Sequence, residues 1–375
     1  MEIKTNISGE GTSKPMFTFD ELKEAETILA DFVEMHASDI FIVTGQPLSY
    51  KRKGKISIYE NDTERVNPAR AERLIRQIYQ MASRDITRLV ETGDDDFSLT
   101  VFNLSRFRVS AYKQRNTYSA VIRVIKFGLP NNKEIGVPDK IIELVNKKNG
   151  IILVTGPAGS GKSTTLACMI DYYNKNRNGH IITLEDPIEY LHNHKNCIVS
   201  QREVGTDTRT YLTALKAALR QSPNVVLLGE MRDHETISVA MTAAETGHLI
   251  LSTLHTVGAA NTIDRIIDAF PPEQQAQIAM QVSMVLQAVV SQQLVPTVDG
   301  NQVPVFEIMK ITPAIRNMIR ENKVHQIDGA IANGAADDMI TMDASLINLY
   351  NAGTITQETL MRYCINQELV QRKIK

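Results

Sequence analysis

The stretch LVTGPAGSGKSTT, residues 153–165, constrains this chain more than any other part of its 375 residues. Residues 156–163 match the pattern G-x-x-x-x-G-K-[ST], with an apolar run before them and a helical pattern after them. In that setting the glycines let backbone N–H groups converge on phosphate oxygens at a helix N-terminus. The two flanking patterns disfavour a glycine-rich turn without a ligand. The motif predicts a phosphate-binding loop made of Gly156, Pro157, Ala158, Gly159, Ser160, Gly161, Lys162, Ser163 and Thr164.

Two side chains of this loop have a predicted chemical role. Lys162 is expected to reach the β and γ phosphates of a nucleotide, and the Ser163 hydroxyl is expected to bind Mg²⁺. The expected ligands are therefore ATP and Mg²⁺. The motif alone does not say which reaction follows.

The pattern of apolar and polar residues around this loop predicts an α/β fold. Apolar runs at 150–155, 180–184, 225–228 and 249–251 alternate with helical patterns, which is typical of parallel strands covered on both faces. From about residue 273 onward the pattern is mostly helical. We expect a nucleotide-binding α/β core with a helical carboxy-terminal extension.

The amino-terminal part has a different pattern. Thr18 to Glu21 fit a capping box, Pro68 is expected to open a second helix, and residues 40–59 contain short β-rich segments. Residues 97–126 indicate antiparallel strands, and the alternation in RFRVSAY places Arg106 and Arg108 on one face. These features predict a smaller α+β domain.

Domain boundaries follow from these changes in pattern. The polar first 15 residues are expected to be a disordered leader, followed by the amino-terminal domain over 16–126. Gly, Pro and Asn over 127–138 indicate a linker, and the nucleotide-binding domain is expected to occupy 139–375.

Composition limits the functional class and the compartment. The formal net charge of −2 argues against a dominant attraction to nucleic acid or to a membrane surface. The three cysteines are widely spaced, which fits a reducing cytoplasm, and no signal peptide is evident. No apolar run approaches the roughly 20 residues that a membrane-spanning helix needs. We expect a cytoplasmic protein without a transmembrane segment.

Polar residues follow three of the predicted strands. Ligands of open parallel sheets lie at the carboxyl ends of the strands, so these residues are expected to gather beside the phosphates. A carboxylate at such a place is often a helix cap or part of a surface ion pair, and a histidine is often a core or capping residue. Several strand ends with polar residues, all following one phosphate-binding loop in the sequence, favour a functional site. The residues are Glu185, Asp186 and Glu189 after the second run, Glu230 after the third, and His248 and His255 around the fourth.

Hydrolysis of ATP needs a metal, a carboxylate that orients water, and a cation that meets the developing charge. Glu230 is the first candidate for the carboxylate and Glu185 the second. Gly229 stands where a Walker B strand usually ends in aspartate. Contact with Mg²⁺ or its waters is therefore left to Glu230 or to the pair Glu185 and Asp186, and the residues do not decide between them.

Together, GPAGSGKSTT, ITLEDPIEY, GEMRDHETI and TGHLILSTLHT resemble the motifs of secretion ATPases. Within that group, HASDIFI, RFRVSAY, TIDRIIDAFP and PAIRNMIRE resemble the PilT family of type IV pilus retraction (twitching motility) ATPases. The resemblance covers the chain from about residue 20 to its end. The four-cysteine zinc insertion that related extension and secretion ATPases usually carry is absent.

The resemblance implies a PAS-like amino-terminal domain joined to a RecA-like core and a homohexameric ring. Arginines of the amino-terminal domain are then expected to complete the nucleotide site, and they map onto Arg106, Arg108 and Arg123. His255 is expected to sense phosphate charge. The implied partners are the pilus machinery and its platform protein in the inner membrane, with which the chain is expected to associate peripherally. The alternative interpretation is that these arginines only form a basic, solvent-exposed face of the strands.

Other functions stay open at this point. A pilus assembly or type II secretion ATPase would hydrolyse the same bond, so the residues do not establish the direction of movement. A RecA-like nucleic-acid motor is disfavoured by the near-neutral charge. A small-molecule kinase with the same loop would need an acceptor for phosphate.

The segment PAIRNMIRE, residues 313–321, predicts a short helix that Pro313 opens. One side of this helix is expected to be apolar, formed by Ala314, Ile315, Met318 and Ile319. The other side is expected to be polar, formed by Arg316, Asn317, Arg320 and Glu321. An amphipathic helix packed on the core is one interpretation, and a coupling element is the other.

Overall fold

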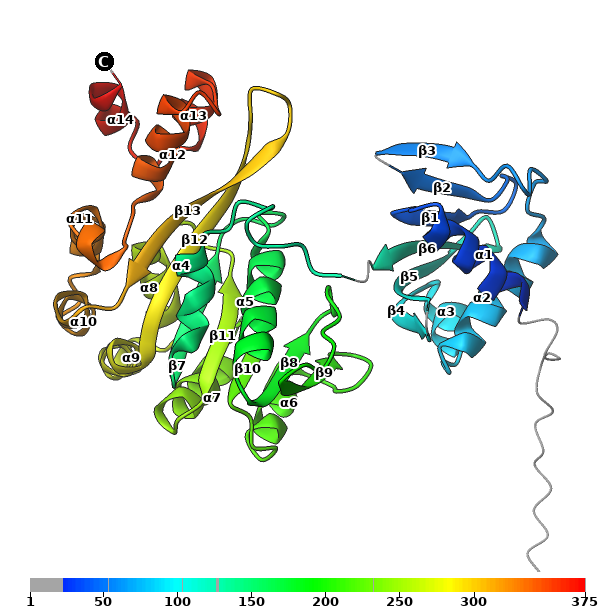
Figure 1. The fold of residues 1–375 in the computed structure, drawn as a ribbon. Helices are drawn as coiled ribbons and strands as arrows, with labels where there is room; N and C mark the ends of the chain where they lie inside the picture. The colour runs from blue at the N-terminus through cyan, green and yellow to red at the C-terminus, as the bar shows by residue number, and fades with distance from the viewer. Residues whose placement is uncertain (1–22, 53, 103, 126–127, 232, 375) are drawn as a thin grey trace, which may run out of the picture. The chain divides into compact units, whose positions relative to one another are not determined.

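The computed structural model of the chain describes residues 23–52, 54–102, 104–125, 128–231 and 233–374. It divides into two compact units, Met1–Phe127 and Gly128–Lys375. Figure 1 shows both units, and each is described by itself. The predicted disordered leader and the capping box at residues 18–21 lie outside the described residues.

The first unit is built on an antiparallel sheet of six described strands in the order β3-β2-β1-β6-β5-β4. Aromatic and aliphatic side chains from α1 and α2 pack on this sheet and form its core. The strands are β1 (Asp39–Ile42), β2 (Ser49–Arg52), β3 (Lys55–Ile58), β4 (Asp94–Val101), β5 (Ser105–Gln114) and β6 (Thr117–Ile125). The helices are α1 (Lys23–Glu34), α2 (Pro68–Met81) and α3 (Thr87–Thr92).

Local predictions for this unit are confirmed where the structure describes them. Pro68 is the first residue of α2, and Asn67 caps that helix by accepting a hydrogen bond from the Arg70 N–H. Along β5 buried and accessible residues alternate, which places Arg106 and Arg108 on the same face. Arg108 lies directly opposite Arg123 of β6 in the register of the sheet.

The second unit contains a sheet of seven described strands in the order β13-β12-β7-β11-β10-β8-β9. All neighbours pair in parallel except the antiparallel edge pair β12 and β13. The four predicted apolar runs become β7 (Gly150–Thr155), β8 (Gly179–Glu185), β10 (Val225–Leu228) and β11 (Leu249–Leu254). The remaining strands are β9 (Cys197–Glu203), β12 (Leu286–Pro296) and β13 (Gln302–Lys310). The predicted α/β fold class with an α+β amino-terminal unit is confirmed.

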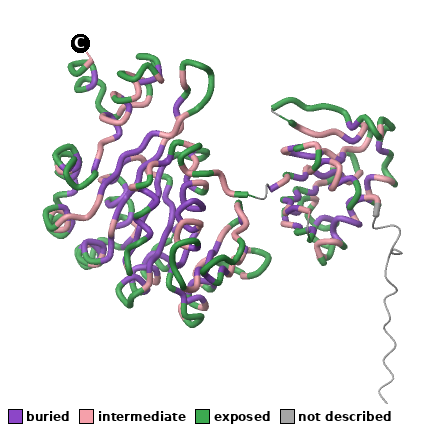
Figure 2. Tube along the Cα trace, viewed as in Figure 1, coloured by how far each residue is buried: buried purple, intermediate pink, exposed green. Residues whose placement is uncertain are grey.

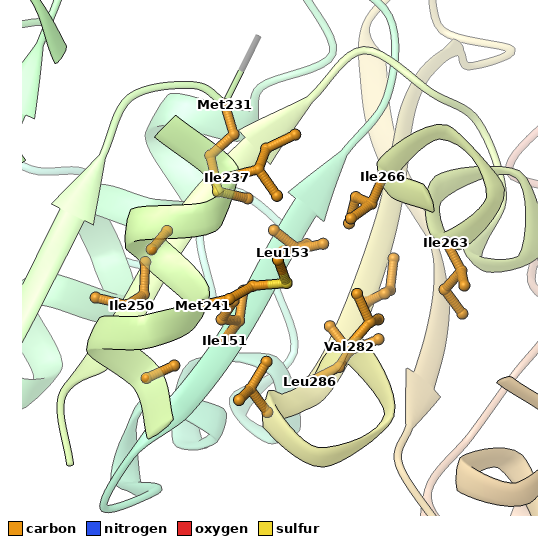
Figure 3. Close-up of a cluster of buried hydrophobic side chains, with 14 of the residues drawn as sticks. Ile151, Leu153, Met231, Ile237, Met241, Ile250, Ile263, Ile266, Val282 and Leu286 are labelled. Atoms are coloured by element: carbon orange, nitrogen blue, oxygen red, sulfur yellow. The ribbon is translucent and has the colours of Figure 1, made fainter. Parts of the chain in front are cut away.

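Helices cover both faces of this sheet, and Figure 2 shows that its central strands are buried. Side chains alternate along β7, so Ile151 and Leu153 pack toward one face while Ile152 and Val154 pack toward the other. Figure 3 shows the first of these two cores. That face is covered by α6 (Tyr211–Ala218), α7 (His234–Glu245), α8 (Ala259–Ile267) and α9 (Pro272–Val285). The opposite face is covered by α4 (Asp139–Ile142), η1 (Glu143–Asn146) and α5 (Lys162–Asn176).

The carboxy-terminal part differs from its predicted helical pattern. Residues 286–310 form the hairpin of β12 and β13, which joins the central sheet next to β7. Most of its inner positions are apolar, and they are buried on both faces, so the helical period is absent there. Helices follow the hairpin, as Figure 1 shows. They are α10 (Pro313–Arg320), η2 (Val324–Gln326), α11 (Ile327–Ala332), η3 (Ala335–Asp337), α12 (Met342–Asn351), α13 (Gln357–Tyr363) and α14 (Gln367–Lys373).

The segment expected to be a linker also differs from the prediction. Val137 is buried, Ile135 packs beside it, and the Pro130 carbonyl accepts a hydrogen bond from Cys168 of α5. These contacts hold residues 130–137 on the second unit. The division of the chain therefore falls at the start of the predicted linker, after Phe127.

Two general features of the described residues complete the fold. None of their helices combines the length and the apolar character needed to cross a membrane. All three cysteines are free thiols, and Cys168 and Cys197 are buried.

Candidate nucleotide-binding site

The predicted phosphate-binding loop joins the end of β7 to the start of α5. Gly156, Gly159 and Gly161 all adopt positive φ, a conformation that favours glycine. A Cβ atom on Gly156 would lie 2.1 Å from the carbonyl oxygen of Gln292 in β12, so the loop is packed against that strand. Only glycine fits the loop at residue 156.

Lys162 is the first residue of α5, and its side chain folds back over the loop. Its ammonium group donates hydrogen bonds to the carbonyl oxygens of Gly156, at 2.8 Å, and of Pro157, at 2.9 Å. Burial lowers the pKa of Lys162, and the nearby Glu230 carboxylate opposes that shift. The positive charge of Lys162 is thus held at the loop, where it interacts electrostatically with the carboxylate of Glu230.

The loop fits a phosphate chain on the evidence of its own polar atoms. The Ser160 hydroxyl oxygen is buried without a hydrogen-bond partner among the described residues. Gly161 is the N-cap of α5 and has no side-chain cap, so the first N–H groups of this 15-residue helix face the loop. A partial positive charge at this end of the helix favours an anion there.

A cleft opens beside the loop at the carboxyl ends of β8, β10 and β11. This is the sheet edge at which ligands of parallel sheets bind. The predicted phosphate and carboxylate residues converge on it. The cleft is lined by Ala158, Gly159, Lys162, Ser163, Glu185, Asp186, Pro187, Glu189, Tyr211, Gly229, Glu230, Thr253 and His255.

Glu230 and His255 face each other across this cleft. The His255 Nε2 atom lies 3.6 Å from the Glu230 Oε2 atom, which is ion-pair distance when the imidazole is protonated. The Glu230 side chain is 14% exposed, whereas that of His255 is 57% exposed. The carboxylate is therefore enclosed and the imidazole is accessible to a ligand in the cleft.

Glu185 is the last residue of β8 and lines the same cleft. Its Oε1 atom accepts a hydrogen bond of 3.3 Å from the Gln201 amide of β9. Although the residue as a whole is only partly buried, its carboxyl group is enclosed, and burial raises the pKa of Glu185 to about 7. A carboxyl group with a pKa near 7 is suited to proton transfer at neutral pH.

The structure explains why the Walker B strand ends in Gly229 rather than aspartate. A Cβ atom at residue 229 would lie 2.8 Å from the Tyr211 hydroxyl and 3.2 Å from the Leu184 carbonyl oxygen. The Gly229 N–H also donates a 2.8 Å hydrogen bond to that same carbonyl. A side chain at residue 229 would therefore require Tyr211 to move, and the acidic side chains at this place are those of Glu185 and Glu230.

His248 does not join the cleft, which corrects the prediction for this residue. It precedes β11 rather than following it, and its carbonyl accepts a hydrogen bond from the N–H of Gly150, the first residue of β7. The His248 Nδ1 atom lies 3.0 Å from the Ala243 carbonyl oxygen. Both contacts lie at the amino ends of the strands, the edge opposite the phosphate-binding loop. His248 is therefore a capping histidine and not a residue of the cleft.

The three arginines proposed to complete the site belong to the first unit. Arg108 is exposed, while Arg123 donates a 3.0 Å hydrogen bond to the Asp39 carboxylate and Arg106 donates one of the same length to the Thr100 hydroxyl. Arg108 and Arg123 share one sheet face. Their role at the nucleotide stays a prediction.

Residues that sequence reasoning missed support the cleft from other strands. The Thr253 hydroxyl donates a 2.6 Å hydrogen bond to the Gly229 carbonyl, which ties β11 to the end of β10. Gln292 of β12 accepts a 2.8 Å hydrogen bond from the Thr165 hydroxyl of α5. The polar residues SQQ inside the otherwise apolar run of residues 288–295 were the available signal, because a buried polar residue needs a partner.

The cleft fits Mg²⁺ only together with phosphate. Ser163, Glu185 and Glu230 line it and supply hard oxygen ligands. Across the described residues, no three His, Cys, Asp or Glu side chains form a group that could hold a metal ion. Mg²⁺ commonly binds through one or two protein oxygens plus substrate phosphates, and these residues match that mode.

Replacing Glu185 with Gln should change how the stability of the protein depends on pH. The folded pKa of about 7 lies above the reference value of 4.5, so the folded state binds more protons between these two values. The associated stability is present below pH 4.5 and is lost as pH rises through 7. Glu185→Gln should therefore gain about 3 kcal/mol relative to the wild type between pH 4.5 and pH 8. Denaturant unfolding at both pH values measures this, and parallel pH dependence of the two proteins would contradict it.

A phosphate-binding loop at the carboxyl edge of a parallel sheet, faced by two glutamates and a histidine, defines a P-loop ATPase. The model of the type II/IV secretion system protein family matches residues 21–360. The chain belongs to this family and, within it, to the PilT group of secretion ATPases.

Three relatives illustrate the likeness. The type IV pilus retraction ATPase PilT of Pseudomonas aeruginosa is 43% identical over 337 residues, which cover 88% of this chain and 95% of that protein. A twitching motility protein of Neisseria gonorrhoeae is 46% identical over 274 residues, 73% of each chain. A crystal structure of the pilus retraction motor PilT with bound ADP is 42% identical and has a TM-score of 0.85, covering 92% of this chain and 98% of that one.

Proposed function

We propose that this ATPase powers the retraction of type IV pili, the process that underlies twitching motility. The observation that carries the proposal is the likeness to proteins named for retraction, which spans both units and nearly the whole of each chain. The helix α10, which carries the segment PAIRNMIRE, adds to this support.

The residues of the cleft divide the work of hydrolysis. Lys162 and the N–H groups of the loop hold the β and γ phosphates. Ser163 with a flanking carboxylate would hold Mg²⁺, which would neutralise phosphate charge when bound. Glu230 orients the attacking water and accepts its proton. The water oxygen bonds to the γ phosphorus while the bond from that phosphorus to the β–γ bridging oxygen breaks, which releases ADP and phosphate. His255, exposed and within 3.6 Å of Glu230, meets the phosphate charge. Glu185 is the second candidate for the base.

The same proposal includes the assembly and location of the protein. The chain forms a homohexamer in which Arg106, Arg108 and Arg123 complete the nucleotide sites. It works in the cytoplasm and is held at the inner membrane through the pilus machinery and its platform protein. The near-neutral net charge of −2 supports attachment through protein partners rather than through lipid or nucleic acid.

Deleting the gene and counting surface pili tests the direction of the motor. Retraction predicts more pili per cell and a loss of twitching, and the wild-type gene supplied in trans should reverse both. A gene carrying Lys162→Ala should fail to reverse them. Cells without pili would identify an assembly or secretion ATPase instead.

The structure of α10 separates its two sides. Ile315 and Ile319 are fully buried in the core that includes α9, and Met318 packs against them. Ala314, expected on the apolar side, is exposed. On the polar side, Arg320 is exposed and donates a hydrogen bond to Asn317 within the same helix.

Arg316→Ala combined with Arg320→Ala should stop retraction while leaving hexamer assembly and basal ATPase largely intact. Neither arginine lines the nucleotide cleft, and the apolar side that anchors the helix is untouched. Twitching assays in cells and ATPase assays on the purified protein measure the two effects.

The matched control is Arg372→Ala with Lys373→Ala, which removes the same charge from the last turn of α14. That pair should leave twitching unchanged. If the α10 variant loses ATPase or fails to assemble, the helix serves folding or ring closure, and its coupling role is wrong.

A further inference from the structure

The hairpin of β12 and β13 contacts the segment that carries His255. Residues 255–258, here called the His255 loop, connect β11 to α8. The Ser291 hydroxyl of β12 accepts a 2.9 Å hydrogen bond from the Gly258 N–H. Glu307 of β13 lies directly opposite Ser291 in the register, and its Oε1 atom accepts a 2.8 Å hydrogen bond from the Ala259 N–H. The hairpin thus holds the point where the His255 loop enters α8.

The second oxygen of Glu307 binds a different helix. Its Oε2 atom accepts a 3.3 Å hydrogen bond from the N–H of Met342, the first residue of α12. Both N–H groups belong to the first turns of helices, which lack partners within those helices. One carboxylate, 2% exposed, therefore joins the start of α8 to the start of α12. An ionised carboxylate suits this place because it only accepts hydrogen bonds and its charge favours helix N-termini.

The buried Glu307 carboxylate destabilises the fold unless it keeps both of its backbone hydrogen bonds. Burial raises the pKa of Glu307, and the acidic neighbours Asp328 and Asp343 raise it further, while the two backbone hydrogen bonds lower it. A buried polar atom that loses its partner destabilises the fold. The two helix starts are therefore held by the same group, and loss of that group frees both of them.

Helix α12 is linked by hydrogen bonds and apolar packing to the other carboxy-terminal helices. The Asp343 carboxylate accepts hydrogen bonds from the N–H groups of Ile365, at 2.6 Å, and Asn366, at 3.0 Å, just before α14. Leu346 packs with Val295 and Val305 of the hairpin in one core that also contains residues of α13 and α14. Glu307 thus lies between the nucleotide cleft and this helical group.

We propose that Glu307 is a positioning residue for ATP hydrolysis: it fixes the His255 loop relative to α12, so that His255 and the carboxy-terminal helices move together. This inference rests on the proposed role of His255 at the phosphates. Glu307 itself is absent from the cleft lining and acts only through the loop that it holds.

Hydrogen–deuterium exchange on the purified full-length protein tests the physical link. Glu307→Met keeps an unbranched side chain but has no strong acceptor, so peptides covering 254–262 and 341–346 should both exchange roughly five to ten times faster. Thr341→Ala is the matched control, because Thr341 caps α12 by accepting a hydrogen bond from the Ala344 N–H and does not contact the loop. It should accelerate only the second peptide. Unchanged exchange at 254–262 in Glu307→Met overturns the proposal.

Steady-state kinetics test whether the link serves hydrolysis. Glu307→Met should lower kcat about tenfold, with KM for ATP changed less than about twofold, because the phosphate-binding loop is untouched. In a His255→Ala background the same substitution should lower kcat by less than about twofold, because the group it positions is already absent. Thr341→Ala should keep wild-type kcat. Glu307→Gln, which retains one acceptor, should show a smaller loss and guards against a folding defect in Glu307→Met.

The outcomes separate this inference from the proposed function. Glu307 would be shown only to support the fold by either of two results. In the first, Glu307→Met lowers kcat equally in the wild-type and His255→Ala backgrounds. In the second, Thr341→Ala lowers kcat as much as Glu307→Met does. Wild-type kcat in His255→Ala would overturn the role of His255 and, with it, that of Glu307 in hydrolysis. A lowered kcat in His255→Ala without coupling to Glu307 would overturn the Glu307 inference alone.

Discussion

Glu230→Gln is expected to lower the rate of ATP hydrolysis by a factor of roughly 10²–10⁴ while ATP still binds. The amide keeps the size of the side chain and can still form hydrogen bonds, but it cannot accept a proton from water. The side chain is 14% exposed and lies opposite His255, so bulk water does not readily replace it. Phosphate release and nucleotide binding, measured on the same preparation, separate the two effects.

Two further variants complete this test. Glu235→Gln changes an exposed carboxylate in the first turn of α7, outside the cleft, and should keep wild-type turnover. Glu185→Gln removes the competing carboxylate. If Glu185→Gln abolishes turnover with binding intact and Glu230→Gln does not, the assignment of the base is reversed.

Lys162→Ala should abolish ATP hydrolysis and weaken nucleotide binding, because the positive charge at the β and γ phosphates is lost. The ammonium group also binds the carbonyl oxygens of Gly156 and Pro157, so the loop loses two internal hydrogen bonds. A thermal unfolding curve is needed beside the ATPase assay to show that the variant is folded. Calorimetric titration with ATP measures the loss of binding.

The matched control on the same helix is Lys175→Ala. Lys175 is exposed, pairs with Asp171 at 2.7 Å, and lies at the opposite end of α5 from the loop. Its loss should leave turnover unchanged. Near-normal turnover in Lys162→Ala would show that this loop is not the catalytic site.

Much of the core could be predicted because the signals are local. The phosphate-binding loop is a continuous motif, and the buried parallel strands are continuous apolar runs. The meeting of Glu185, Glu230 and His255 followed from one rule, that carboxyl ends of parallel strands share an edge. His248 was misplaced although the signal was present, because it precedes its strand and therefore lies at the other edge.

Features that depend on distant parts of the chain could not be predicted. The hairpin of β12 and β13 lies between helices, and its pairing with β7, which makes it part of the central sheet, could not be predicted. The packing of residues 130–137 on the second unit depends on contacts with α5. Composition and local period carry no information about such contacts.

The sequence by itself determined the class of protein, because phosphate binding requires a loop of fixed residue types and short spacing, and Gly156 to Ser163 meet that requirement without help from elsewhere. Only the tertiary structure decided why Gly229 replaces the usual aspartate, because the crowding comes from Tyr211 and Leu184 on other elements. It also decided that Glu307 holds the start of α8 and the start of α12 together, across 48 and 35 residues of sequence. Hydrogen bonds and close approaches of this kind depend on distance in space, and the fold alone sets those distances.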